Sequence, residues 1–242
     1  MYSMKDIVNS LPAEKIKQDG IWTRLILRPL SFPVSWLALK MKLTPAFISY
    51  FSGILAIIGG VLFAWPSGDF CPYLPAMPYF AGIGVILLNF FSVLDCVDGN
   101  MARVSGKAGP WGGWADAVMG FIAYTSVFFS TGLYIFWKTN FWEVLVLAGL
   151  TSSANLLSRV AYQIYKNIDG EKAHGTVSFE RLLAENVGIT GFMMPLLLIF
   201  HFIDFLPGMW GIIFFNAAFY GGGCVITVIK LAIKAGKGAT QK

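Results

Sequence analysis

Charged side chains are scarce in this chain. Asp, Glu, Lys and Arg together make up 13% of its residues, whereas hydrophobic side chains make up 56%. A soluble domain carries roughly 25% charged residues. The shortage of charge therefore excludes an ordinary soluble domain and predicts an integral membrane protein.

Cysteine and histidine are also rare. The three cysteines, Cys71, Cys96 and Cys224, are odd in number, far apart and without the spacing of metal ligands. They therefore indicate neither a disulfide framework nor a zinc site. Of the two histidines, His174 lies in a polar loop and is expected to be exposed, and His201 is expected at a membrane interface.

The chain lacks a basic cluster of the kind that binds nucleic acid, although its formal net charge is +5. Its Lys and Arg residues flank apolar segments and are not interleaved with stacking aromatic residues, as they would be on a nucleic-acid-binding surface. We therefore exclude nucleic acid as a partner and expect membrane lipids instead.

No signal peptide is visible, because residues 1–20 are polar and mixed in charge. Residues 21–43 alternate apolar groups with Arg and Lys, and Pro29 and Pro33 interrupt them. This pattern predicts an amphipathic juxtamembrane helix, since its apolar part is too short to cross ~30 Å of hydrocarbon. A tilted first span is the alternative. Residues 1–44 thus form a cytosolic segment that ends in a surface helix.

Long apolar runs fill the rest of the chain and predict an all-α fold, because a helix satisfies its own backbone hydrogen bonds in lipid. We expect six transmembrane helices, at residues 45–65, 77–94, 117–137, 139–165, 186–203 and 205–229. They form one domain over residues 45–235, which a cytosolic tail at 236–242 follows.

The basic residues predict the orientation of these spans. With the N-terminus inside, Lys138 is the one residue among 18 Lys and Arg that lies in an outer loop. Positive charge favours the cytosolic side. We therefore expect a multi-pass protein of a bacterial inner membrane, with both termini in the cytosol.

The residues that indicate chemistry lie where two apolar segments meet. At spacings i, i+3, i+4, i+7 and i+8, one helix face carries Asp95, Asp98, Gly99, Ala102 and Arg103. Acids three apart can hold a hard divalent cation, small residues leave room for a planar group, and arginine can pair with a phosphate. Asp116 opens the next helix and can complete the cluster on the cytosolic face. Such ionisable groups are costly at a membrane boundary, which favours a functional role.

This stretch resembles the CDP-alcohol phosphotransferase (CDP-alcohol phosphatidyltransferase) family. That family carries Asp, two residues, Asp-Gly, two residues, Ala-Arg, eight residues, Gly, three residues, Asp, three residues and a final Asp. The chain matches all positions and spacings but the last, with Asp95, Asp98, Gly99, Ala102, Arg103, Gly112 and Asp116. The last position is Gly120.

The resemblance implies a transferase that moves a phospho-alcohol group from a CDP-linked alcohol donor to an acceptor hydroxyl and releases CMP, in phospholipid or related lipid or glycan synthesis. It implies that Asp95, Asp98 and Asp116 are catalytic and hold Mg²⁺ or Mn²⁺, with two ions expected. It also implies a donor nucleotide site made by Asp95, Asp98, Gly99, Ala102, Arg103 and Gly112. A homodimer is implied as well, and small residues along the third and sixth spans would allow close packing.

Gly120 stands where the family has its proposed general base. One interpretation is an active enzyme with an altered acceptor site, in which Gly120 makes room for the acceptor. Another is a catalytically inactive relative that still binds nucleotide. An ion-coupled transporter is a third hypothesis, but transporters place their acids near the midplane and between repeats, whereas no repeat is visible here.

Arg159 interrupts an otherwise neutral apolar run. It is expected either to face protein or water, as an acceptor-binding residue beside Gly120, or to extend to the inner headgroups. The sequence leaves both positions open.

Overall fold

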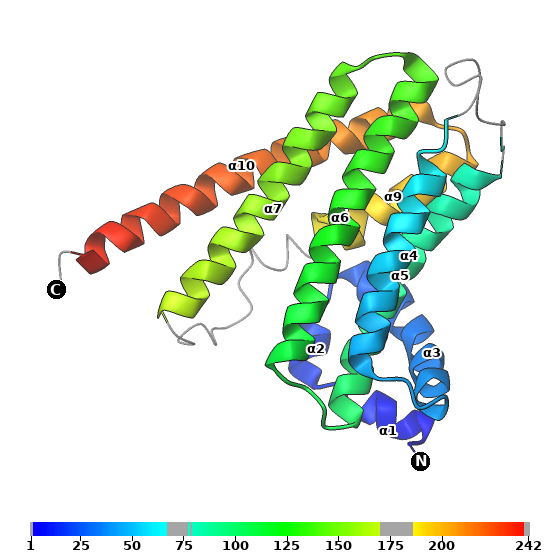
Figure 1. The fold of residues 1–242 in the computed structure, drawn as a ribbon, viewed down its shortest axis with the longest axis vertical. Helices are drawn as coiled ribbons and strands as arrows, with labels where there is room; N and C mark the ends of the chain where they lie inside the picture. Colours follow the sequence, from blue (N-terminus) through cyan, green and yellow to red (C-terminus); the bar gives the residue numbers. More distant parts are fainter. Residues whose placement is uncertain (1, 67–76, 78, 170–185, 240–242) are drawn as a thin grey trace.

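The computed structural model describes residues 2–66, 77, 79–169 and 186–239. Within these ranges the regular structure is helical, with no strand (Figure 1). In chain order the elements are α1 (Met4–Asn9), α2 (Ala13–Gln18), η1 (Thr23–Leu27), α3 (Arg28–Lys40), α4 (Pro45–Phe63), α5 (Phe80–Val104), α6 (Pro110–Thr139), α7 (Glu143–Asp169), η2 (Ile189–Met193), α9 (Met194–Phe202) and α10 (Leu206–Ala239). The predicted all-α fold is confirmed.

Five of the described helices, α4 to α7 and α10, are long and apolar enough to cross a membrane. This result confirms an integral membrane protein, but the predicted span at residues 186–203 is shorter than expected. It consists of η2, with five residues, and α9, with nine. Together they are about 21 Å long at 1.5 Å per residue, less than the ~30 Å of hydrocarbon. The extended backbone of Gly188 precedes η2, so the six predicted spans become five long helices and one short helix.

Helix α4 packs closely against both α5 and α6 through glycine residues. A Cβ atom on Gly84 of α5 would lie 2.2 Å from the backbone nitrogen of Phe63 in α4. A Cβ atom on Gly60 of α4 would lie 3.2 Å from the Cβ atom of Ser126 in α6. Small residues allow this approach of helix backbones in membranes. Helix α4 thereby fixes the positions of the two helices that carry the acidic residues.

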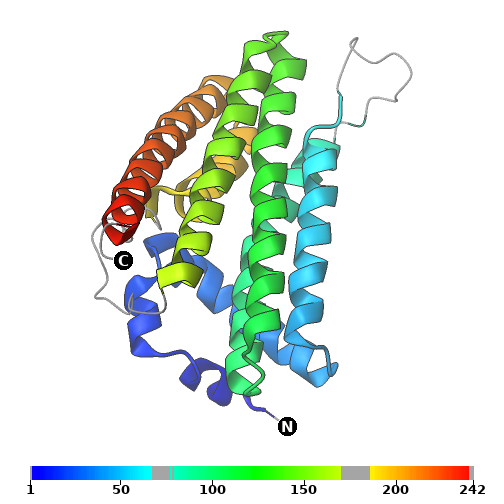
Figure 2. The same cartoon turned by 60° about the vertical axis from the view of Figure 1, so that its left-hand side comes forward.

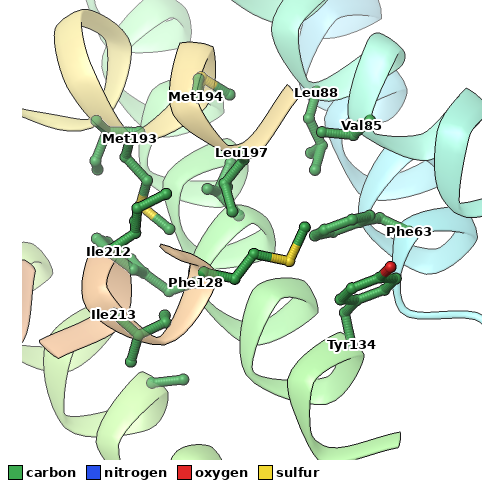
Figure 3. Close-up of a cluster of buried hydrophobic side chains, with 14 of the residues drawn as sticks. Phe63, Val85, Leu88, Phe128, Tyr134, Met193, Met194, Leu197, Ile212 and Ile213 are labelled. Atoms are coloured by element: carbon green, nitrogen blue, oxygen red, sulfur yellow. The ribbon is translucent and has the colours of Figure 1, made fainter. Parts of the chain in front are cut away.

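The main hydrophobic cluster joins α4, α5, α6, η2, α9 and α10. Figure 3 shows Phe63 and Tyr134 next to each other, and their rings stack with centroids 4.6 Å apart. Met193, Met194 and Leu197 are buried in the same cluster. The first turns of α9 are therefore held by protein contacts, whereas Ile199 and Phe202 near its end are exposed.

The N-terminal segment contains α3, which continues through Pro33, although this proline was expected to interrupt it. Helix η1 runs directly into α3, and the combined run from Thr23 to Lys40 carries Arg24, Arg28 and Lys40. It is not among the described helices that are long and apolar enough to cross a membrane, and the tilted first span stays an alternative. Helix α3 exposes Leu30 and Leu37 and buries Ser31 and Ser35 against the bundle. Its location on a membrane surface stays a prediction.

Helix α10 ends near mid-height in Figures 1 and 2, whereas α1 lies in the lower half of both views. The connection between α5 and α6 lies in the same half. The N-terminal end of the described chain is thus on the side of the bundle that carries the acidic motif. Which side of a membrane this half faces stays a prediction.

Candidate functional site

The acidic motif lies where α5 ends and α6 begins. Helix α5 extends to Val104 and α6 starts at Pro110, so all three motif acids are helical. The side chains of Asp95 and Asp116 lie next to each other across the two helices, and both line the same cavity. Asp98 is 7% exposed and accepts a hydrogen bond from Ser49 Oγ of α4. The three acids therefore come from one junction, but Asp98 faces a different neighbour.

The paired carboxyl groups bear on the expected metal site. Two ionised carboxylates this close repel each other, and a divalent cation held between them would relieve that repulsion. Their oxygen atoms are the ligands that Mg²⁺ and Mn²⁺ prefer. Among the described residues, however, no three His, Cys, Asp or Glu side chains already form a metal-holding group. The donor chemistry fits a divalent cation, and a ligand set of three acids stays a prediction.

A cavity of about 420 Å³ opens on one side of the acids. Its lining includes the motif residues Asp98, Gly99, Ala102, Gly112 and Asp116. A Cβ atom on Gly112 would meet no other atom within 4 Å. Gly112 therefore faces open space, in which a ligand can approach the helix backbone. We call this space the donor cavity.

Three polar side chains that were not singled out from the sequence also line the donor cavity. Thr44 and Ser49 come from the start of α4, and Lys107 comes from the connection between α5 and α6. Thr44 also caps α4, because its Oγ1 accepts a hydrogen bond from Phe47 N at 3.1 Å. Thr44 followed by Pro45 is a common way for a helix to begin. It does not indicate a site, so the sequence gives no specific signal for these three residues.

Arg103 is adjacent to the donor cavity and is not part of its lining. A Cβ atom on Gly99 would lie 3.1 Å from Arg103 Nη1, so the guanidinium group lies directly beside Gly99. Its Nη2 donates a hydrogen bond to Asn100 Oδ1 at 2.7 Å. Its Nε is buried without a hydrogen-bond partner. Such an unsatisfied donor is costly and is typical of a group that awaits a ligand.

Two further cavities lie on the other side of the acid pair. One of about 330 Å³ is lined by Asp95, Asp116, Gly120 and Arg159, among others. The other, of about 250 Å³, is lined by Asp95 and Arg159 and by Lys15 and Asp19 of the N-terminal segment. Arg159 borders both, and we call the two together the acceptor-side cavities. The structure thus places Arg159 beside the acids and brings it together with Gly120.

Arg159 is held in this position by an aromatic ring. Its guanidinium carbon lies 4.5 Å from the ring centroid of Tyr124, a cation–π geometry. Gly120 lies one helical turn before Tyr124 on α6 and is buried. A Cβ atom on Gly120 would meet only Tyr124 Cε2, at 3.8 Å. The position of the missing family carboxylate therefore has room for a side chain.

An ion pair from the N-terminal segment closes one wall of the acceptor side. Arg28 Nε and Nη2 donate to the two carboxylate oxygens of Asp19 at 2.7 and 3.2 Å. Burial acts to lower the pKa of Arg28, but the hydrogen bonds to Asp19 together with the nearby acidic groups outweigh it and hold that pKa above its usual value. From the sequence, Asp19 belongs to the polar segment at 1–20 and Arg28 to the amphipathic helix at 21–43, and no local pattern reveals that the two pair.

Of the two histidines, His201 is described by the structure and is not part of this site. His201 lies near the opposite end of the bundle, with its ring centroid 5.9 Å from that of Phe63 and 5.6 Å from that of Tyr134. His174 lies outside the described residues.

Comparison with known proteins gives one informative relative. No family model matches the chain. The chain is similar to a phosphatidylinositol phosphate synthase of Streptomyces avermitilis, with 37% identity over 76 residues. The match covers 31% of this chain and 27% of the relative, so it spans about a quarter of that protein's length. Because the relative is itself a CDP-alcohol phosphatidyltransferase, the resemblance drawn from the motif is confirmed.

Proposed function

We propose that this chain is a membrane-embedded CDP-alcohol phosphotransferase. It would transfer a phospho-alcohol group, phosphatidyl or smaller, from a CDP-linked donor to an acceptor hydroxyl and release CMP. The observation that carries the proposal is the position of the acid pair Asp95–Asp116 between two kinds of cavity. One is lined by the small motif residues, and the others are lined by charged side chains.

The donor cavity suits the nucleotide part of the donor. Its volume of about 420 Å³ falls in the usual range of roughly 300–1,000 Å³ for small-molecule sites. Gly99, Ala102 and Gly112 let a planar base approach the helix backbones. Lys107 and Arg103 supply positive charge for the phosphates, and the unpaired Nε of Arg103 is a donor that a phosphate oxygen could satisfy.

Asp95, Asp98 and Asp116 would hold the Mg²⁺ or Mn²⁺ ions, of which we expect two. Divalent cations, when bound, neutralise the charge that develops on the departing phosphate. The chain's own contribution is to hold the carboxylates: Ser49 orients Asp98 from α4, while α5 and α6 bring Asp95 and Asp116 into contact. These supports keep the oxygens directed toward the junction of the cavities.

The acceptor would enter from the side of Arg159 and Gly120. Arg159 and Lys15 give this side positive charge, which favours an acceptor with an anionic or strongly polar group. Besides the motif acids, Asp19 is the one carboxylate in these linings, and both of its oxygens already accept hydrogen bonds from Arg28. We infer that an anionic group of the acceptor itself takes the hydroxyl proton.

A second candidate is an inactive relative that binds nucleotide without turning it over. The observation that favours it is Gly120, which leaves the family's proposed base position without a carboxylate. The intact metal and nucleotide residues favour the active enzyme, because random loss would not spare them. No observation in the described residues favours a transporter.

A homodimer and a cytosolic active site complete the proposal. Of the small residues expected to allow chain association, Gly132 of α6 is used within the chain, since its added Cβ would lie 2.7 Å from Ala148 Cβ of α7. Gly221, Gly222 and Gly223 of α10 have no atom within 4 Å of an added Cβ. The open surface of α10 is therefore where we expect a second copy.

Product analysis tests the proposed function. Purified protein in lipid nanodiscs is incubated with Mg²⁺, a panel of CDP-linked alcohols and a membrane extract, and products are identified by mass spectrometry. We expect CMP together with a new phosphodiester product, and neither with Asp116→Asn. Binding of CDP without any CMP release across the panel would favour the inactive relative, and no binding of CDP would contradict both.

A further inference from the structure

Asn100 is the centre of a buried polar network, although it is not one of the motif residues. It lies on α5 directly after Gly99, and its side chain is fully buried. Its Nδ2 donates to Ser31 Oγ at 2.9 Å and to Ser35 Oγ at 3.2 Å, both on α3. Its Oδ1 accepts from Arg103 Nη2 at 2.7 Å and from Arg28 Nη1 at 3.4 Å. Asn100 thus connects the N-terminal segment to the arginine of the donor site.

The network uses the full hydrogen-bonding capacity of the Asn100 amide. An asparagine side chain offers two N–H donors and one oxygen with two lone pairs, and each has a partner here. The reverse orientation would place the NH₂ group against two guanidinium groups, which have no acceptor. The oxygen is therefore required to face the arginines, and the orientation of the amide follows from its neighbours.

The outer part of the network is a buried ion pair. Arg28 and Asp19 are 7% and 5% exposed, and the carboxylate receives two N–H groups of the same guanidinium. This two-bond arrangement fixes the plane of the Arg28 guanidinium group. The remaining Arg28 nitrogen, Nη1, is the one directed at Asn100 Oδ1.

We propose that Asn100 is a positioning residue that sets the orientation of Arg103 toward the donor phosphates, and that the Asp19–Arg28 pair holds Asn100 in place. Asn100 binds one end of the Arg103 guanidinium group, which leaves Nε for a ligand. The inference rests on the proposed function in taking Arg103 as a phosphate-binding group. The N-terminal segment, through Asp19 after α2 and Arg28 of α3, would thereby tune the affinity of the donor cavity for a diphosphate.

A purely structural role would make the same contacts, so the test must separate the two. If Asn100 only fastened α3 to α5, its loss would lower stability and leave the preference for phosphate groups unchanged. If it positions Arg103, its loss would weaken CDP binding and spare cytidine, because cytidine has no phosphates for Arg103 to contact. The effect would also require Arg103 to be present.

The experiment is a double-mutant cycle on the full chain in lipid nanodiscs with Mg²⁺. The variants are Asn100→Ala, Arg103→Ala and both together, and the affinities for CDP and for cytidine are measured. We expect Asn100→Ala to weaken CDP binding about tenfold, the scale of one hydrogen bond to a charged group, and to have no further effect in Arg103→Ala. Equal losses for CDP and cytidine, or fully additive losses, would overturn the inference.

Asn89 supplies a matched control on the same helix. Its Nδ2 also makes two hydrogen bonds, to Val85 O at 2.9 Å and Met194 O at 3.1 Å, but none of these groups contacts Arg103. We expect Asn89→Ala to lower thermal stability without changing the ratio of CDP to cytidine affinity. A change in that ratio as large as that of Asn100→Ala would also overturn the inference.

A second measurement needs no nucleotide and remains useful if Asn100→Ala folds poorly. The rate at which phenylglyoxal modifies Arg103 is followed by mass spectrometry in the wild-type chain and in Asp19→Asn, which nearly preserves side-chain shape. We expect Arg103 to react several-fold faster in the variant, because Arg28 and then Asn100 lose their fixed orientation. An unchanged rate would contradict the positioning role. Failure of the wild-type chain to bind CDP would instead contradict the proposed function, and the modification rate would still decide the position of Arg103.

Discussion

The two sides of the acid pair differ in how the chain builds them. The donor cavity is lined mainly by residues within one short stretch, from Asp98 to Asp116, with a contribution from the start of α4. The acceptor-side cavities take residues from α2, η1, α3, α5, α6, α7, η2 and α10. A local motif thus makes one side, and distant elements assemble the other.

Their chemistry differs in the same way. The donor cavity is lined largely by glycine and alanine, which suits the close approach of a rigid, planar ligand. The acceptor side is lined by Arg159, Lys15, Asp19 and tyrosines, which recognise a ligand by charge and hydrogen bonds. Changes of shape should therefore affect the donor, and changes of charge should affect the acceptor.

The acids between the two sides should give the largest effect. Asp98→Asn or Asp116→Asn should lower CMP release about 100-fold or more, the scale on which loss of electrostatic stabilisation slows catalysis. Release of CMP from a CDP-linked donor at saturating Mg²⁺ is the measurement. Asp204→Asn is the control, because Asp204 has a positive φ of 51°, which asparagine tolerates, and lies at the other end of the bundle. Full activity in either motif variant would remove that residue from the site.

Filling the donor cavity should have the next largest effect. Gly99→Leu or Ala102→Leu should weaken CDP binding about tenfold or more, given the usual 1–3 kcal/mol cost of overpacking. Calorimetric titration with CDP is the measurement. Gly222→Leu, on the open face of α10, is the control and should bind CDP normally. If Gly99→Leu binds CDP like the wild-type chain, the nucleotide lies elsewhere.

Removing charge on the acceptor side should separate the two substrates. Arg159→Ala should raise the KM for the acceptor about tenfold, on the scale of a lost charge-assisted hydrogen bond, and leave the KM for the donor unchanged. Steady-state kinetics with each substrate varied in turn provides the measurement. Arg159→Lys keeps the charge but loses the planar group, and its KM for the acceptor should fall between those of the wild-type chain and Arg159→Ala. A change in the KM for the donor alone would instead place Arg159 at the donor site and contradict the prediction.

Gly120 should give the smallest and most diagnostic effect. Gly120→Asp should slow turnover with the native acceptor several-fold, although it restores the family pattern, because a third carboxylate beside Asp95 and Asp116 would repel an anionic acceptor. Gly120→Ala is the control for size, and the open space at this position should leave its turnover near normal. Faster turnover in Gly120→Asp would identify a degraded member of the family.

The donor side, which a local motif makes, could be predicted from the sequence better than the acceptor side, which distant elements assemble. The spacing of Asp95, Asp98, Gly99 and Ala102 predicts one shared helix face, because it depends only on local helix geometry. In the structure Asp98, Gly99 and Ala102 line the donor cavity, and Asp95 lies next to Asp116. The partner of Asp98 could not be predicted, since Ser49 is one of several serines in an apolar run. Asn100 likewise occupies a variable position of the motif and gains its role only from the packing of α3.

The remaining differences have specific physical causes. The short segment formed by η2 and α9 was expected to cross the membrane because its residues are apolar. Apolar character alone does not distinguish a membrane span from a helix that packs inside the protein. Pro33 was expected to break a helix, yet α3 continues through it. The ion pair of Asp19 and Arg28 depends on the fold of the N-terminal segment, which charge pattern alone does not determine.

The central claim is that donor and acceptor bind on opposite sides of one acid pair. The most direct measurement is the affinity for CDP, with and without Mg²⁺, in the wild-type chain, in Gly99→Leu and in Arg159→Ala. We expect Mg²⁺-dependent binding of CDP that Gly99→Leu weakens about tenfold and Arg159→Ala leaves unchanged. CDP affinity that is independent of Mg²⁺, or that depends on Arg159 and not on Gly99, would contradict it.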